Sequence, residues 1–289
     1  MKYLKGIDYC NIDKGLEFLK NHRLNHYPKD NEEIIFHVYW YGKITRKQIL
    51  CIKSYLATQN LERTKLWVWL DEDTYHSEKE NITTHKNILV KKYAPNYESE
   101  NTPLQHKDYV NQTKYLKFRS DLARLIFLYK YGGLYYDLDM ILLKDLMPIL
   151  DLEFCYQWSV EPKGNNGILR LKKQSLICKY IMDKYILELK KRSFFLGFNI
   201  HIFNSSNNIL CLPCVFFDPV WVLEDTKTTS KYSKLDRFDN FFKTTKEQVD
   251  IKNFFGGLIY AYHWHSRNDS VIEKDSYFEL LETDVNKNI

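Results

Sequence analysis

The stretch Tyr131–Asp139, which reads Tyr-Gly-Gly-Leu-Tyr-Tyr-Asp-Leu-Asp, is the part of this chain that decides its fold. It ends a long amphipathic segment, turns on two glycines, continues as a short apolar strand and finishes at Asp137 and Asp139. Carboxylate oxygens suit Mg²⁺ or Mn²⁺, and protein-bound Mg²⁺ is usually held by one or two carboxylates together with substrate phosphates. The stretch therefore predicts a metal site for a phosphate-bearing ligand, and a nucleotide-dependent enzyme is the first hypothesis.

Apolar runs and helical patterns alternate around this stretch. Strand patterns separated by helical patterns indicate βαβ units and a parallel sheet. The predicted fold class is therefore α/β, with a Rossmann-like, mostly parallel sheet flanked by helices. We predict strands at 33–40, 66–70, 87–90 and 134–136, helices at 45–59 and 113–131, and a loop at 93–112.

The second half of the chain is less regular. Residues 154–160 and 167–171 have strand patterns around an expected turn at Asn165-Asn166, and residues 174–190 have a helical pattern. No internal repeat or low-complexity linker interrupts the chain, so a single elaborated domain is favoured.

The composition argues against several classes of protein. The 289 residues have a formal net charge of +5, and they contain no dense Lys/Arg patch with interleaved aromatics of the kind that binds nucleic acid. No run approaches about 18 consecutive apolar residues, and Met1–Leu19 lacks the apolar core of a signal peptide. We therefore expect no nucleic-acid partner, no transmembrane segment and a cytoplasmic location.

A charged pair precedes the glycines on the predicted helix. Asp121 and Arg124 follow Ser120 and are i,i+3 neighbours, so both side chains can reach the same edge of a cleft. A carboxylate there could accept hydrogen bonds from sugar hydroxyls, and a guanidinium could orient it or contact a phosphate. An ordinary surface salt bridge is the alternative explanation of the pair taken alone.

The whole run, Ser120-Asp121-x-x-Arg124 followed by Gly132-Gly133-x-Tyr135-x-Asp137-x-Asp139, resembles the DXD-containing sugar-binding region of glycosyltransferase family 32. That family includes initiating mannosyltransferases and capsular-polysaccharide transferases, and the clostridial glucosylating toxins have a similar core. The apolar strand that ends at Trp40 is similar to the family's first strand. The resemblance implies a GT-A glycosyltransferase fold and transfer with retention of anomeric configuration.

The resemblance also implies roles for particular residues. Asp137 and Asp139 would bind Mn²⁺ or Mg²⁺, with His263 or His265 completing the metal shell. Alternation along a strand puts these two histidines on one face and Trp264 on the other. The catalytic residues implied are Asp121, Arg124 and Asp137. The donor-binding residues implied are Trp40, Tyr39, Asp121, Arg124, Asp137, Asn166, Trp264 and Ser266.

By the same resemblance, one GT-A-like catalytic domain would span residues 1–289. It would comprise an N-terminal helical extension (1–32), a nucleotide-sugar-binding half (33–145), an acceptor-side half with a closing segment (146–270) and a polar tail (271–289). The implied reaction is metal-dependent hexosyl transfer from a nucleoside diphosphate sugar to a hydroxyl of a glycan or of a protein- or lipid-linked acceptor.

Two other readings remain open from the sequence. A non-catalytic module of the same fold could bind glycan or nucleotide without transfer. A metal-dependent phosphohydrolase could use Asp137 and Asp139, but a two-metal site would need further clustered carboxylates. Asp71, Glu72 and Asp73, at the end of another predicted strand, are the evident supply.

Overall fold

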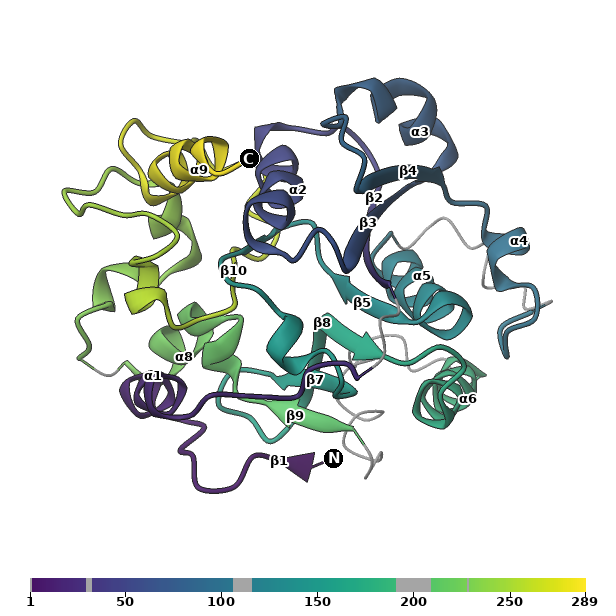
Figure 1. The fold of residues 1–289 in the computed structure, drawn as a ribbon, viewed down its shortest axis with the longest axis horizontal. Coiled ribbons are helices and arrows are strands. Elements are labelled where there is room, and N and C mark those ends of the chain that lie inside the picture. The colour runs from purple at the N-terminus through teal and green to yellow at the C-terminus, as the bar shows by residue number, and fades with distance from the viewer. Residues whose placement is uncertain (1, 30–32, 106–115, 191–208, 228) are drawn as a thin grey trace.

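The structure, a computed structural model, describes residues 2–29, 33–105, 116–190, 209–227 and 229–289 (Figure 1). Within these residues, eight strands form one sheet in the order β1-β9-β7-β8-β5-β2-β3-β4, and β6 and β10 form a separate antiparallel pair. The strands are β1 (Lys2–Tyr3), β2 (Ile34–Trp40), β3 (Thr64–Leu70), β4 (Ile88–Lys92), β5 (Gly133–Tyr136), β6 (Met140–Leu142), β7 (Phe154–Gln157), β8 (Gly164–Leu171), β9 (Leu210–Leu212) and β10 (Ala261–His263).

The large sheet is mostly parallel, as the sequence predicted. Strands β5, β2, β3 and β4 are parallel neighbours, and β9 is parallel to β1 and β7. Only β8 runs against its neighbours β5 and β7. Strand β5, which leads to Asp137 and Asp139, therefore lies inside the sheet between β2 and β8.

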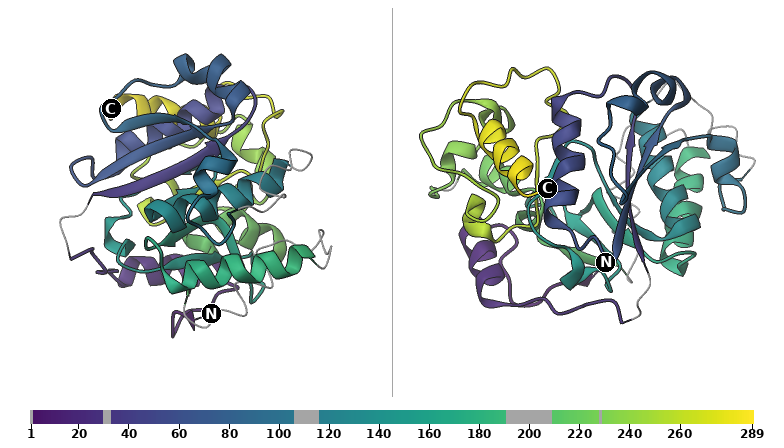
Figure 2. Two further views of the ribbon diagram at one scale, coloured as in Figure 1. Left: turned by 90° about the vertical axis from the view of Figure 1, so that its right-hand side faces the viewer. Right: turned by 45° about the horizontal axis from the view of Figure 1, so that its top comes forward.

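Helices cover both faces of the sheet. Along β2, Phe36 and Val38 face a core shared with α2 and α9, whereas Tyr39 belongs to a second core shared with α5 and α6. Figure 2 shows α2 and α9 on one side of the sheet and α5 and α6 on the other. The helices are α1 (Ile12–Asn21), α2 (Arg46–Thr58), α3 (Glu72–Glu78), α4 (Pro95–Ser99), α5 (Leu116–Tyr131), α6 (Leu176–Lys190), α8 (Pro219–Thr226) and α9 (Tyr277–Lys287).

The two glycines join α5 to β5 in the way that the sequence predicted. Gly132 has φ +70° and ends α5, so it forms the left-handed cap that glycine favours at a helix C-terminus. Gly133 has φ +105°, and a Cβ there would lie 2.0 Å from the carbonyl oxygen of Ile35. The buried ring of His37 donates from Nε2 to the Gly132 carbonyl at 2.9 Å and accepts from Trp69 at its other nitrogen. The turn is thereby fastened to β2.

The prediction of a turn at Asn165-Asn166 is wrong. Both asparagines lie inside β8 and are buried, and the β7–β8 turn comes earlier, where Trp158 N–H donates to Lys163 O at 2.7 Å. The side chain of Asn166 accepts a tertiary hydrogen bond from Arg124, whereas Asn165 Oδ1 accepts locally from Gly167 N–H. The tertiary contact and the strand pairing thus hold in β8 a dipeptide that locally favours a turn. The short strand after Asp139, β6, pairs with β10 and not with the large sheet.

The two chain ends are more ordered than their composition indicated. Besides α1, the N-terminal region contributes β1, which pairs with β9 at one edge of the sheet. The polar tail contains α9, which begins at the N-cap Ser276 and packs on α2 through Phe278 and Leu281. The described part of 93–112, expected to be a loop, includes α4. No described helix is both long and apolar enough to cross a membrane.

Candidate active site

Asp137 and Asp139 lie in the turn that follows β5. Asp137 N–H still donates to Gly167 O of β8 at 2.8 Å, but Met140 N–H donates back to Asp137 O at 3.1 Å and closes the turn. One ligand atom from each of Asp137, Asp139 and His263 lies within 4.8 Å of the other two. The structure thus brings together three of the four residues that the resemblance implies as metal ligands.

Asp139 is buried and is held by the C-terminal segment. Its Oδ1 lies 2.9 Å from His263 Nε2, and its Oδ2 accepts from the backbone N–H of Ser266 at 2.6 Å. Burial acts to raise the pKa of Asp139, but the neighbouring His263 and the Ser266 N–H hold that pKa well below its usual value. The side chain is therefore ionised and presents two acceptor oxygens.

The segment after β10 leaves strand conformation at once. His265 and Ser266 have φ of +50° and +53°, in the left-handed region that non-glycine residues rarely adopt. The rings of His263 and His265 stack with centroids 3.7 Å apart, on the same side of the segment. Ser266, an expected donor-binding residue, is thereby turned toward Asp139.

Trp264 lies on the opposite side. Its ring is fully buried and packs against the rings of Phe241, Phe242 and Phe278. The structure therefore does not bring Trp264 to the carboxylates, and we do not retain it as a donor-binding residue. The reason is that neighbouring side chains point to opposite sides where β10 ends, so His263 faces the site and Trp264 faces the core.

Arg124 joins α5 to the strand ends. Its guanidinium donates to Asp137 Oδ1 at 3.1 Å and to the carbonyl and side-chain oxygens of Asn166 at 2.6 and 2.8 Å. Asn166 in turn donates to Asp121 Oδ1 at 3.1 Å. Burial and the nearby Asp139 raise the pKa of Asp137, and Arg124 partly offsets this rise. The four residues Asp121, Arg124, Asp137 and Asn166 thus form one network, as a shared donor site requires.

One further residue at the site, Asp218, was not predicted from sequence. Asp218, fully buried ahead of α8, has its Oδ2 2.6 Å from His265 Nε2 and 3.6 Å from His263 Nδ1. Burial acts to raise its pKa, but the histidines lower it to about 2. Conversely, burial lowers the pKa of His265, whereas Asp139 and Asp218 raise the pKa of His263 despite its burial. The sequence feature that could have indicated Asp218 is its position as a lone carboxylate in the apolar run Phe216-Phe217-Asp218-Pro219.

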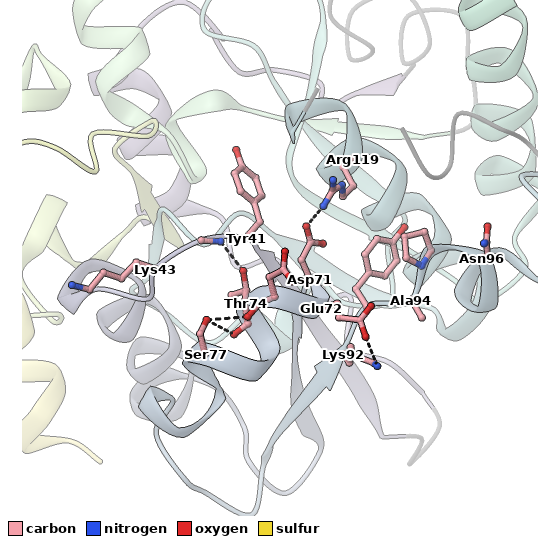
Figure 3. A pocket seen from close by; sticks show the side chains of 14 residues that line it. Tyr41, Lys43, Asp71, Glu72, Thr74, Ser77, Lys92, Ala94, Asn96 and Arg119 are labelled. Carbon is pink, nitrogen blue, oxygen red and sulfur yellow. Dashed lines mark hydrogen bonds and ion pairs between the residues drawn. The ribbon is translucent and has the colours of Figure 1, made fainter. Parts of the chain in front are cut away.

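A hollow of about 800 Å³ opens at the carboxyl ends of β2, β3 and β4 (Figure 3). Tyr41 lines it, and so does Asp71, which forms an ion pair with Arg119 of α5. Tyr39 is buried beneath and donates its hydroxyl to Asp71. Trp40 is half-buried and stacks on Tyr41, with centroids 6.1 Å apart. Two donor-binding residues were expected on β2. Trp40 stacks on Tyr41, and Tyr39 donates its hydroxyl to Asp71; Tyr41 and Asp71 both line the hollow.

Sequence comparison now agrees with this geometry. Residues 47–155 match the family model described as a glycosyltransferase sugar-binding region containing a DXD motif. The chain is a glycosyltransferase of the DXD type. The matched region contains Asp121, Arg124, Asp137 and Asp139. No curated protein matches the chain.

Three solved glycosyltransferase structures match the chain, and the likeness in fold rests on the one with a TM-score above 0.5. The apo form of GlyE from Streptococcus pneumoniae TIGR4 is 13% identical, with a TM-score of 0.52 over 88% of this chain and 62% of that one. PaToxG is 17% identical, with a TM-score of 0.47 over 68% and 76%. An active-site mutant of LgtC is 14% identical, with a TM-score of 0.47 over 88% and 95%. The DXD-type glycosyltransferase has the α/β architecture of the GT-A fold.

Proposed function

We propose that this glycosyltransferase transfers a hexosyl group from a nucleoside diphosphate sugar to an acceptor hydroxyl, using a divalent metal held by Asp137, Asp139 and His263. The observation that supports the proposal most is the convergence of these three side chains at the end of β5, within 4.8 Å of one another. The ordered position of Asp139 between His263 and Ser266 fits a prepared ligand set better than a pair of solvated carboxylates.

The donor atoms fit the proposed metal. Carboxylate oxygens suit both Mg²⁺ and Mn²⁺, and an imidazole nitrogen favours Mn²⁺ over Mg²⁺. Bound there, the ion would neutralise the charge that develops on the departing diphosphate. Asp71 lines the hollow, but its carboxylate already accepts a hydrogen bond from Tyr39 and pairs with Arg119. It therefore does not supply the further metal ligands that a two-metal phosphohydrolase would need.

The side chains around the metal ligands would hold the donor sugar. Arg124 fixes the orientation of Asp137 and Asn166, and Asn166 orients Asp121. The carboxylate of Asp121 retains acceptor capacity for sugar hydroxyls, since an ionised carboxylate has about four lone-pair sites. The segment at Ser266 would cover the reacting groups and limit hydrolysis of the donor by water.

We assign the nucleotide to the hollow beside Tyr41. Ligands of open α/β sheets bind outside the carboxyl ends of the strands, which is where this hollow lies. Trp40 and Tyr41 offer aromatic faces for the base, and Lys43 and Arg119 supply positive charge for the diphosphate. Retention of configuration, by attack from the face of the leaving group, is proposed from the family resemblance. Proton NMR of the product's anomeric signal tests it, and an inverted product would contradict it.

A thermal-shift panel of UDP- and GDP-linked hexoses, each with Mn²⁺, tests the donor site. A ligand at 100 times its dissociation constant should stabilise the wild type by about 2.7 kcal/mol. The Asp139→Asn variant should lose this stabilisation. The matched control is Asp151→Asn, which removes a carboxylate that pairs with Lys172 on the surface. The assignment is wrong if no nucleotide sugar stabilises the wild type more than Asp139→Asn.

A further inference from the structure

Two fully buried side chains, Asp218 and Tyr156, lie behind the proposed metal ligand His263 and have no assigned role. They form one hydrogen-bonded group with His263 and His265. Tyr156 comes from β7 and Asp218 from the residue before α8, so two separate elements converge on the rings of the closing segment. Buried polar groups of this kind determine which way an imidazole faces and which nitrogen carries its proton.

The hydrogen bonds fix which ring nitrogen of His263 faces the carboxylates. The Tyr156 hydroxyl donates to Asp218 Oδ2 at 3.1 Å, because an ionised carboxylate can only accept. The lone pairs of that hydroxyl then face His263 Nδ1, which is 3.4 Å away, so Nδ1 donates on this side of the ring. Nε2 lies on the opposite side, 2.9 Å from Asp139 Oδ1, and is therefore the nitrogen directed at the proposed metal ligands.

The same carboxylate engages His265 in a different way. His265 directs Nε2 at Asp218 Oδ2, 2.6 Å away, so this nitrogen is already used as a donor. The His265 ring is also held between His263 on one side, with centroids 3.7 Å apart, and Trp221 on the other, at 4.4 Å. A ring stacked on both faces cannot swing toward Asp139 without losing both contacts.

We propose that Asp218 and Tyr156 are positioning residues that present His263 Nε2 as the single imidazole ligand of the metal and keep His265 out of the metal shell. This inference rests on the metal dependence proposed above. It gives a physical reason for His263 rather than His265 as the ligand, and it adds two residues that act through His263 without touching the metal. Partners of this kind typically contribute 10- to 100-fold to metal affinity.

The affinity for Mn²⁺ alone, measured from the electron paramagnetic resonance signal of the free ion, tests the positioning role. We expect about tenfold weaker binding in Tyr156→Phe and in Asp218→Asn. The matched control is Tyr136→Phe, which also removes a buried phenol hydroxyl, here from the strand that leads to the carboxylates. That hydroxyl has no hydrogen-bond partner within the described parts of the chain, so the control should bind Mn²⁺ like the wild type.

The second measurement identifies the ligand nitrogen. Electron spin-echo spectroscopy of bound Mn²⁺ should show coupling to one histidine nitrogen in the wild type. The coupling should persist in His265→Asn, whose amide can still donate to Asp218, and should disappear in His263→Asn. Tyr156→Phe should keep the coupling while it binds the ion more weakly, a combination that general unfolding would not produce.

The outcomes separate this inference from the proposed function. A wild type that binds no Mn²⁺, with or without a nucleotide sugar, overturns the metal dependence itself. Binding that is unchanged in both Tyr156→Phe and Asp218→Asn, or equally weakened in Tyr136→Phe, overturns the positioning role alone. Two bound ions per chain, one of them lost in His265→Asn, would instead make Asp218 and His265 ligands of a second metal, and would also overturn it.

Discussion

The guanidinium of Arg124 donates a hydrogen bond to Asp137 Oδ1 at 3.1 Å, and this contact links the middle of α5 to the turn that carries the DXD carboxylates. Both side chains are largely shielded from water, and the same guanidinium also binds Asn166. One planar group thus sets the relative positions of a helix, a strand end and a neighbouring strand, as a bidentate arginine fork allows and a lysine does not.

Removing Arg124 should destabilise the protein and disable the site. In Arg124→Ala the carboxylate of Asp137 loses its buried partner, so we expect the free energy of unfolding to fall by about 3 to 5 kcal/mol. Arg124→Lys keeps the charge but loses the fork, and should fold with a smaller loss while kcat/KM falls about 100-fold through misplacement of Asp137. Urea unfolding and steady-state kinetics check both values. Equal kinetics in Arg124→Lys and wild type would contradict the positioning argument.

Gly133→Ala should be one of the most damaging small substitutions in the chain. The new Cβ would lie 2.0 Å from Ile35 O in the adjacent strand, at a backbone φ of +105°. Strain of about 1 to 3 kcal/mol adds to this overlap, so we expect a loss above about 3 kcal/mol in the free energy of unfolding.

Gly42→Ala is the matched control for Gly133. Gly42 also has positive φ, at +86°, but a Cβ there would meet no atom within 4 Å. Its substitution should lower the free energy of unfolding by only about 1 to 2 kcal/mol, which is the cost of placing alanine at a positive φ. Similar losses at the two glycines in a chemical-denaturation experiment would show that the close approach to Ile35 is not what the turn requires.

His37 should make the protein less stable in acid. Burial lowers the pKa of His37 in the folded state to about 3, from the ordinary value of 6.5. Between these values the unfolded chain binds a proton that the folded chain does not. The contribution of neutral His37 is therefore complete above pH 6.5 and is lost as the pH falls toward 3.

The difference between wild type and His37→Gln isolates this effect. Glutamine can still donate to the Gly132 carbonyl, but it does not titrate. The free energy of unfolding of the wild type should fall relative to the variant by up to about 1.4 kcal/mol per pH unit below pH 6. Parallel pH profiles for the two proteins would show that His37 is protonated in the folded state.

Lys47 should hold the closing segment in place. Its buried ammonium donates to the carbonyl oxygens of Asn268 and Ser270 at 3.1 and 2.7 Å, and also to Arg267 O. Lys47→Met leaves these carbonyls without the cation, so the segment with Ser266 should loosen. We expect about a tenfold rise in KM for the nucleotide sugar, the equivalent of one charged hydrogen bond. Limited proteolysis should show faster cleavage at 266–270.

Lys53→Met is the control on the same helix. Lys53 is half-buried, and its ammonium bonds only the side chain of Asn286 in the described structure. Its substitution should leave both KM and proteolysis unchanged. If Lys47→Met behaves like Lys53→Met, the hydrogen bonds to the segment do not control donor binding.

Several features of this glycosyltransferase were determined by local sequence. The alternation of apolar strands and amphipathic helices was sufficient for the α/β class, because side-chain periodicity depends only on neighbouring residues. Gly132 ended α5 as predicted, because its positive φ is a local requirement. The Asp137-x-Asp139 pair and the Asp121-x-x-Arg124 pair were also recognisable, since each acts through short spacing on a single element.

Only the tertiary structure decided which distant groups meet. Asp139 and His263 are 124 positions apart and touch because β6 pairs with β10, a contact that no local pattern encodes. The buried role of Asp218 and the strand position of Asn166 were missed for the same reason, because each depends on partners from other elements. Residue chemistry thus predicted a metal and a phosphate-bearing ligand, and the family resemblance implied the donor sugar. Long-range packing brings the proposed ligands and the residues beside them together, because it fixes the distances between side chains.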